Sequence, residues 1–481
     1  DFAAQAIALR APDASAPYTV TLLLALATAI TLAAMLRALV ARGGAFPLVF
    51  GLMAVLVAPL AAVAQELFWQ PAQVIGTYPW ALHVMALAAL MVMLAVKFAS
   101  ADGEDRRRAA YATLSALSLI ALALFLIATK SALTLALAAL VVTAAGLDRK
   151  FRLPEMGWFI QLGVAVLGWR LTVDPGFDWA LTASLPQAIL AFSGVIIAMV
   201  AAWYLLRPLD RPLPTGVLES AAFGFSALFA NVLITRWLRA DITDLNAVDW
   251  TQTHWGIVMN AMPWLVLMLV QLYRVQLGGL LRPLRFGIAV VAGAFAAGGV
   301  LLAAVGQNPL AAWGREDIQG LVYGPWLLDT LLLAYALPGL MLLAAALKMP
   351  WLDRRLRIGF AACGTALVVL YGVLEIRRFW QGDWLGIPGI TQPELYSYTV
   401  ALMLTGAALL YQAIARRSAL LRRAAMAVIG LTVAKVFFID AAGLTGLTRV
   451  FSFLGLGLSL AGLAWLNRWA ASTSETGTSE K

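Results

Sequence analysis

The sequence has few of the residues on which most soluble proteins rely. Its 481 residues include one cysteine and two histidines, and only 12% are charged, whereas an ordinary soluble domain has about 25% charged residues. Cys363 alone excludes an internal disulfide and a cysteine-rich metal site. The phosphate-binding GxxxxGK[ST] loop, the dinucleotide-binding GxGxxG fingerprint, HExxH and paired CxxC are also absent. The common nucleotide-dependent and zinc-dependent enzyme classes are therefore disfavoured.

Apolar residues dominate instead, at 62% of the chain with a mean hydropathy of +0.86. A membrane-spanning helix needs about 20 mainly apolar residues, and a window of that length predicts an all-α, polytopic integral membrane bundle of fifteen transmembrane helices. The shortest polar break lies at Lys130, where only this charge and its small polar neighbours separate two spans. The predicted spans are 18–40, 46–66, 78–98, 109–129, 131–147, 154–172, 185–206, 216–238, 252–273, 284–305, 324–347, 356–375, 395–415, 420–441 and 446–466.

The net charge of +9 is not gathered into one surface stripe, which disfavours a nucleic-acid partner. The basic residues instead cluster in every second predicted loop. Because cytoplasmic loops collect Lys and Arg, this alternation predicts an outside N-terminus and an inside C-terminus. We expect an external tail over 1–17, a single transmembrane domain over 18–469 and a disordered cytoplasmic tail over 470–481. The external tail lacks a signal-peptide pattern, so we expect it to be truncated or processed.

Ionisable residues inside the predicted spans gather toward the outside. Ionised side chains cost about 2.5–3.5 kcal/mol at the bilayer centre, so they face a partner, a cavity or water. By position along their spans, Arg170 and Lys435 lie in the outer third, His83 and Asp329 lie just below the outer boundary, and Asp440 lies near it. Most of the 17 tryptophans also fall near the outer face. This coincidence predicts an outward-facing cavity lined by Trp, carboxylates and basic groups.

Structural roles compete with functional ones at each position. Glu375 with Arg377 and Arg378 fits an ion pair at the membrane interface. His83 fits a hydrogen-bonded structural histidine, with no second histidine beside it for a metal site. For Asp329 and Lys435, the sequence favours neither a functional role nor a structural one.

Lys435 and Asp440 are five residues apart, which is about 140° around an α-helix. We therefore expect them not to pair with each other, and each to face another helix.

The C-terminal third contains two distinctive stretches, 431–440 (LTVAKVFFID) and 446–457 (GLTRVFSFLGLG), and upstream of them lie Glu375-Ile376-Arg377-Arg378 and Tyr396-Ser397. In these stretches the chain resembles a family of large bacterial polytopic membrane proteins known only as domain of unknown function 2339. It is specific over about 370–468, and elsewhere it reflects shared hydropathy. The resemblance implies no activity, so Glu375, Lys435, Asp440 and Arg449 are motif positions only. Family members tend to be longer, with an N-terminal soluble or coiled-coil segment.

Three hypotheses from different classes remain open. In the first, an inner-membrane protein binds, transfers or transports a cell-envelope amphiphile such as a lipid-linked saccharide. Asp329 or Glu375 would be the base, while Arg170, Lys435 or Arg449 would hold an anionic head. The site would also include Asp440, His83 and Arg377. In the second, an ion-coupled solute transporter uses Asp329, His83 and Lys435 as coupling groups. The third is a scaffold subunit of a membrane complex. We expect membrane lipids as partners in each case, and no cofactor or metal.

Overall fold

The computed structural model describes residues 17–40, 46–239, 249–311 and 320–440, and most residues of a further short helical segment between 450 and 465. Most of these residues are helical, and among them the only extended pairing is an isolated bridge between Leu321 and Trp384. The predicted all-α fold class is therefore confirmed. Arg449, both terminal tails and much of the last predicted span lie outside the described residues.

Contacts divide the chain into two compact units. Unit 1 comprises Asp1–Asp241 with Asn260–Ala296, and unit 2 comprises Ile242–Met259 with Ala297–Lys481. The helix α12 (His254–Val275) begins in unit 2 and continues in unit 1, and α13 (Arg282–Leu301) passes from unit 1 into unit 2. The other helices of unit 1 are α2 (Pro17–Val40), α3 (Phe46–Trp69), α4 (Pro71–Val74), α5 (Thr77–Asp102), α6 (Arg107–Ile127), α7 (Lys130–Phe151), α8 (Met156–Thr172), α9 (Gly176–Thr182), α10 (Leu185–Leu206) and α11 (Pro212–Leu238).

Between Ala297 and Asp440, the described part of unit 2 contains four further α-helices, α14 to α17, and several short turns of other pitch. Three of these turns are π-helical, η2, η5 and η6, and they lie at the ends of longer helices. The elements are η1 (Trp250–Gln252), η2 (Leu302–Gly306), η3 (Pro309–Ala311), η5 (Leu332–Ala336), α14 (Leu337–Lys348), α15 (Arg354–Gln381), α16 (Gln392–Ala415), α17 (Ala419–Lys435) and η6 (Val436–Asp440).

Eleven helices among the described residues are long and apolar enough to cross a membrane, or up to twelve if the bent pair α8 and α9 is one span. The count of fifteen and the orientation of the termini stay predictions. The break expected at Lys130 is present, because α6 ends at Ile127 and α7 begins at Lys130.

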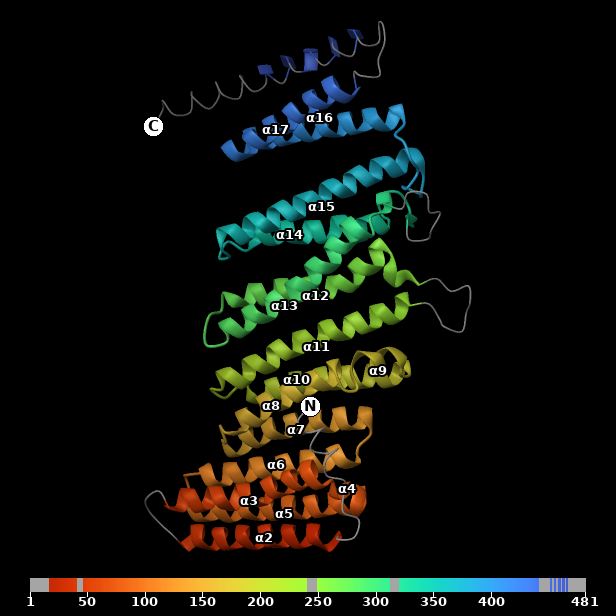
Figure 1. Ribbon diagram of the computed structural model, residues 1–481. Helices are drawn as coiled ribbons and strands as arrows, with labels where there is room; N and C mark the ends of the chain where they lie inside the picture. Colours follow the sequence, from red (N-terminus) through yellow and green to blue (C-terminus); the bar gives the residue numbers. More distant parts are fainter. Residues whose placement is uncertain are drawn as a thin grey trace, which may run out of the picture. The chain divides into compact units, whose positions relative to one another are not determined.

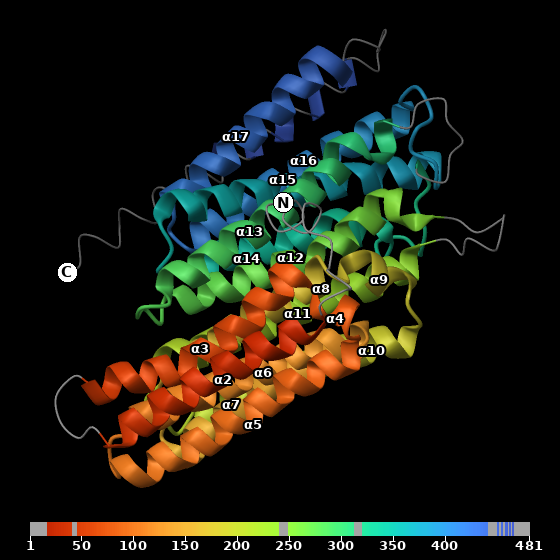
Figure 2. The ribbon, with the colours of Figure 1, turned by 60° about the horizontal axis from the view of Figure 1, so that its bottom comes forward.

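Several helices pack as antiparallel neighbours of the next one along the chain, among them the pairs α2–α3, α5–α6, α7–α8, α10–α11, α14–α15 and α16–α17 (Figures 1 and 2). The predicted inside loops of unit 1 therefore meet at one end. There Arg211, before α11, donates two hydrogen bonds to the buried Asp148 of α7 at 2.9 and 3.1 Å. These hydrogen bonds raise the pKa of Arg211 above its usual value.

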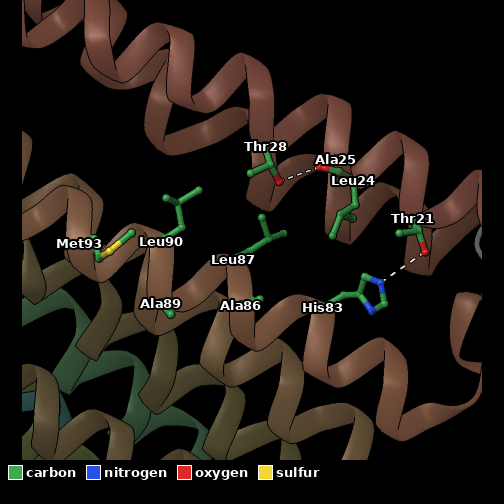
Figure 3. A pocket seen from close by; sticks show the side chains of 10 residues that line it. All are labelled: Thr21, Leu24, Ala25, Thr28, His83, Ala86, Leu87, Ala89, Leu90 and Met93. Carbon is green, nitrogen blue, oxygen red and sulfur yellow. Dashed lines mark hydrogen bonds between the residues drawn. The ribbon is translucent and has the colours of Figure 1, made fainter.

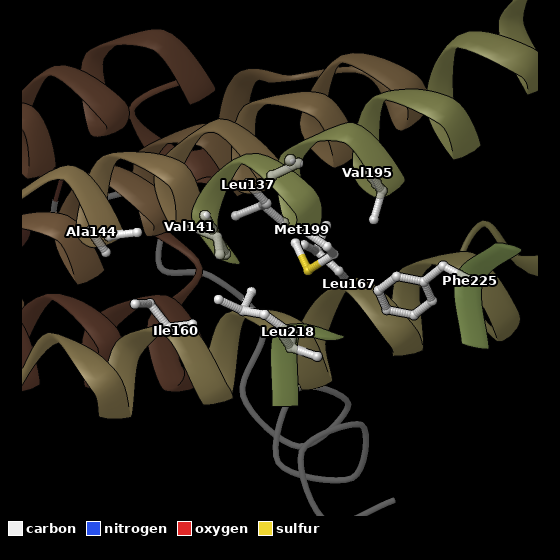
Figure 4. Packing of buried hydrophobic residues seen from close by; sticks show 14 of the residues in the cluster. Leu137, Val141, Ala144, Ile160, Leu167, Val195, Met199, Leu218 and Phe225 are labelled. Atoms are coloured by element: carbon white, nitrogen blue, oxygen red, sulfur yellow. The ribbon is translucent and has the colours of Figure 1, made fainter. Parts of the chain in front are cut away.

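One of the buried clusters of unit 1 is a layer of interlocking apolar side chains. Leu137 and Val141 of α7 meet Ile160 of α8 and Met199 of α10 there, and Leu218 and Phe225 of α11 complete the layer (Figure 4). Large apolar side chains also cover the outside of the helices, for example Leu82 and Phe295. Water disfavours such a surface and lipid does not, so close packing rather than hydrophobic burial holds the helices together.

Two glycines bring helices α14 and α15 into backbone contact in unit 2. A Cβ atom on Gly339 would lie 2.9 Å from the carbonyl oxygen of Gly364, and one on Gly364 would lie 2.7 Å from that of Gly339. Both distances are too short for carbon and oxygen. Small residues are typical where membrane helices approach this closely.

Candidate functional site

A network of buried charged side chains lies at the end of unit 2 that the charge pattern predicts to be outside. Its first centre is Arg377, near the C-terminus of α15, which is 7% exposed. Its guanidinium group donates to the carbonyl oxygens of Leu385 at 2.8 Å and Gly389 at 3.3 Å, and also to that of Ile387. It forms an ion pair with the buried Glu394 of α16 at 3.1 Å. Arg377 therefore fixes the α15–α16 loop against both helices.

Glu394 is held from several sides. Gln381 donates to it at 2.6 Å and the Tyr398 hydroxyl at 3.0 Å. It also forms a capping box with Thr391, the residue that precedes α16. Glu394 was not among the predicted site residues, although the Thr391-x-x-Glu394 pattern before an apolar run is a recognisable sign of a helix N-terminus.

The adjacent Arg378 is the second centre. Its guanidinium group forms ion pairs with Asp329 at 2.6 Å and Asp383 at 2.7 Å, and donates to the carbonyl oxygen of Gly324 at 2.6 Å. Asp329 also accepts from the backbone N–H groups of Leu331 and Leu332, so it caps the helix that begins there. Arg378 therefore links the segment before α14 to the end of α15.

Glu375 differs from the other carboxylates of the network. It is 4% exposed, and neither of its oxygens has a hydrogen-bond partner at good geometry in the described part of the chain. The Asp329 and Tyr371 side chains and the Leu327 main chain nevertheless lie close to it, and Asp329 and Arg378 are its charged neighbours. The Tyr371 hydroxyl donates to the carbonyl oxygen of Leu327 at 2.9 Å. An ionised carboxylate buried in this way costs several kcal/mol, so a proton or a donor from a bound molecule has to complete it.

Lys435 and Asp440 form an ion pair at 2.6 Å, so the expectation that they do not pair is wrong. The reason is the local pitch, because residues 436–440 form the π-helical turn η6, which brings positions five apart onto one face. The second part of that expectation holds, because both side chains also reach α16. Lys435 donates to Thr399 at 2.6 Å and to the carbonyl oxygen of Leu395 at 3.0 Å, and Thr399 donates to Asp440 at 2.5 Å.

These groups join into one network through the first turns of α16, where Arg377 binds Glu394 and Lys435 binds the next carbonyl group. The network contains three basic side chains and five carboxylates, so it carries two excess negative charges if all are ionised. The basic side chains are Arg377, Arg378 and Lys435, and the carboxylates are Asp329, Glu375, Asp383, Glu394 and Asp440.

Three exposed aromatic rings lie beside this network. Trp326 and Phe379 have ring centroids 5.6 Å apart, and those of Phe379 and Trp380 are 5.1 Å apart. Each ring is 42–60% exposed. Phe379 follows Glu375 by four residues on α15, so the two share a helix face.

The other predicted site residues lie elsewhere. Arg170, in unit 1, forms an ion pair with Asp174 at 3.3 Å. His83 accepts or donates hydrogen bonds with the Pro79 carbonyl oxygen at 2.7 Å and with Thr21 at 3.3 Å. It lines an apolar hollow of about 420 Å³ between α2 and α5 (Figure 3). The structure thus brings Asp329, Glu375, Arg377, Lys435 and Asp440 into one network.

A protein-family model described as "Predicted membrane protein (DUF2339)" matches residues 3–469. The chain belongs to this family. The match covers nearly the whole of this DUF2339 chain, and so extends well beyond the C-terminal third on which the resemblance was based. No curated protein and no solved structure matches the chain. The match and the apolar helices together make it a multi-pass membrane protein.

The network itself limits the chemistry of this DUF2339 protein. Its basic groups are already paired with acids, so an anionic head would meet excess negative charge. No group of three or more His, Cys, Asp or Glu side chains suited to a metal ion occurs among the described residues. The Glu375 carboxylate is the part of the network that can accept further hydrogen bonds.

Proposed function

We propose that this chain is a bacterial inner-membrane protein that handles a cell-envelope amphiphile, such as a lipid-linked saccharide, at the outer end of unit 2. The observation that carries the proposal is the buried, donor-free carboxylate of Glu375 next to exposed aromatic rings. A hydroxyl-rich head donates the missing hydrogen bonds. Aromatic faces suit sugar rings and acyl chains.

The charge balance of the network indicates which of its residues contact the bound molecule. Arg377, Arg378 and Lys435 are used within the network, so they position loops and helix ends rather than hold an anionic head. Glu375 is the group that contacts the head, and Asp329 beside it orients Arg378. Transfer chemistry would use the Glu375 carboxyl group as the base.

Glu375→Gln tests this proposal, with Glu104→Gln, in an exposed loop, as the matched control. Each protein is purified in lipid nanodiscs from the same host, and the co-purifying lipids are identified by mass spectrometry. We expect saccharide-bearing lipids with the wild-type and control proteins and a clear loss with Glu375→Gln, together with altered envelope glycan composition in cells. Identical lipids and glycans in all three proteins would refute the proposal.

A proton-coupled solute transporter is the second candidate, because a buried carboxylate without a donor is also suited to carrying a coupling proton. Flux measurements in proteoliposomes with an imposed pH gradient distinguish the transporter from the amphiphile-handling protein. Solute flux with the wild-type protein that is lost in Glu375→Gln favours transport. Flux no higher than that of empty vesicles would contradict the transporter hypothesis. Purification of a stable complex with other membrane proteins would instead favour a scaffold role.

A further inference from the structure

A hollow of about 280 Å³ lies between α10 and α11 in unit 1, at the end that the charge pattern predicts to be inside. Trp203 and Glu219 line it near the helix ends, whereas Ile196 and Ser226 line it further along. At 1.5 Å per residue, Ile196 is about 15 Å from the end of α10 at Leu206. The hollow therefore runs from the membrane surface to about the middle of a bilayer about 30 Å thick.

The walls of this hollow are apolar and its surface end is basic. Met199, Val200 and Ala222 form much of its wall further along the helices, and Leu218 lies beside Glu219 nearer the start of α11. At the surface end, the guanidinium group of Arg207 lies 5.5 Å from the ring centre of Trp203, and that of Arg274 lies 5.3 Å from the ring centre of Phe223. Both rings line the hollow, so each guanidinium group lies next to a side chain of its wall.

Positive charge is in excess at this end. Glu219, the acid that lines the hollow, forms an ion pair with Arg274. A third guanidinium group, that of Arg285 on α13, is an electrostatic neighbour of both. Arg207, next to Trp203, is a further basic group beside the hollow, so the three arginines outnumber Glu219, the one carboxylate in the lining, by two.

Several buried donors here are also unused in the described part of the chain. Arg274 and Arg285 are each 7% exposed, and neither Nη1 of Arg274 nor Nε of Arg285 has a hydrogen-bond partner. The contacts of Arg285 with the carbonyl oxygens of Arg274 and Gly278 are long, at 3.4 Å. Buried guanidinium groups normally satisfy their donors, and phosphate is a well-matched acceptor.

We propose that this hollow binds an anionic phospholipid, with an acyl chain along the α10–α11 wall and the phosphate at Arg274 and Arg207. Basic pockets between helices on the cytoplasmic side of a membrane suit anionic head groups. A cationic partner is disfavoured by the two excess positive charges, and a free anion would leave the apolar wall unexplained. The proposal concerns unit 1 and is independent of the function proposed for unit 2.

Native mass spectrometry of the detergent-solubilised full chain tests the proposal. Phosphatidylglycerol and phosphatidylcholine with identical acyl chains are the probes. We expect wild type to prefer phosphatidylglycerol, and Arg207→Ala to weaken its binding about fivefold, the effect of one surface charge. Arg274→Ala is expected to weaken it about tenfold or more, because it removes a charge-assisted contact.

Two further variants keep the test decisive. Arg207 is exposed, so its substitution reports on binding even if Arg274→Ala fails to fold. Ala222→Leu narrows the hollow without changing charge, and we expect it to weaken both lipids. Arg149→Ala, an exposed arginine at the end of α7, removes the same charge elsewhere and is expected to change nothing.

Three results would overturn the proposal. The first is equal binding of the two lipids by wild type. The second is an unchanged preference for phosphatidylglycerol in Arg207→Ala together with unchanged affinity in Ala222→Leu. The third is displacement of the bound lipid by millimolar inorganic phosphate, which would assign the site to a free anion.

Discussion

Substitution of Arg377 by Met is expected to destabilise unit 2 strongly, and the structure sets the magnitude. The side chain forms one ion pair with the fully buried Glu394 and donates to three carbonyl groups of the α15–α16 loop. Removing one partner of a buried ion pair costs about 3–5 kcal/mol, because the other charge is left uncompensated. At about 2–4 °C per kcal/mol, the melting temperature should fall by about 6–20 °C.

Thermal unfolding in detergent, followed by tryptophan fluorescence, measures this change. Arg354→Met is the matched control, because it makes the same substitution at an exposed position on the same helix; we expect it to stay within about 0.5 kcal/mol of wild type. A double-mutant cycle with Glu394→Gln isolates the ion pair, since Gln at this position still supports the capping box. The expected coupling energy is about 1–3 kcal/mol.

Two results would refute this reasoning. One is an Arg377→Met protein that unfolds within about 1 kcal/mol of the control, which is below the range for a buried pair. The other is a coupling energy of zero, which would show that the loss comes from the loop carbonyl groups and not from Glu394.

Two further predictions use the same unfolding assay. Lys435→Met should destabilise the protein more than Asp440→Asn, by about 1–3 kcal/mol, because it leaves a buried carboxylate, whereas the new amide still accepts the hydrogen bond from Thr399. Equal losses would contradict this role of Thr399, and no loss in either variant would contradict the ion pair. Gly364→Ala should destabilise by about 1–3 kcal/mol through its clash with α14, whereas Gly372→Ala, with no atom within 4 Å of the new Cβ, should stabilise by about 0.5–1 kcal/mol.

The helices could be predicted from the sequence because a membrane imposes one simple requirement. Every backbone polar group inside the bilayer has to be satisfied within its own segment, so long apolar runs become helices. The span predicted at 185–206 coincides with α10, and the one predicted at 18–40 differs from α2 by one residue. The weak break at Lys130 was also predictable, since small polar residues flank the only charge in that stretch.

The partners within the site were harder to predict, because they depend on how helix ends and loops fold back. Glu375, Arg377 and Arg378 looked like one local ion pair, but the structure pairs Arg377 with Glu394 and Arg378 with Asp329. The pairing follows from the α15–α16 loop and from the segment before α14, and no sequence period encodes either one. The sequence therefore predicted that these charged side chains lie near the outer membrane boundary, but it did not predict which of them pair.

The pairing of Lys435 with Asp440 depends on a π-helical turn, and turns of this kind recur in unit 2. The three π-helical turns found in the described residues, η2, η5 and η6, all belong to unit 2. Tyr335 of η5 donates from its buried hydroxyl to the carbonyl oxygen of Ala303 in η2 at 2.9 Å. Asp329 caps the segment that leads into η5, and Asp440 ends η6.

Wide turns of this kind have poorer geometry than an α-helix and recur at functional sites in proteins. Here two of the three directly adjoin buried carboxylates of the network, at Asp329 and Asp440. A chain that only had to fill the membrane with packed helices would gain stability from regular α-helix at both places. The coincidence of irregular backbone, excess negative charge and a donor-free Glu375 therefore favours this end of unit 2 as the place where the protein acts.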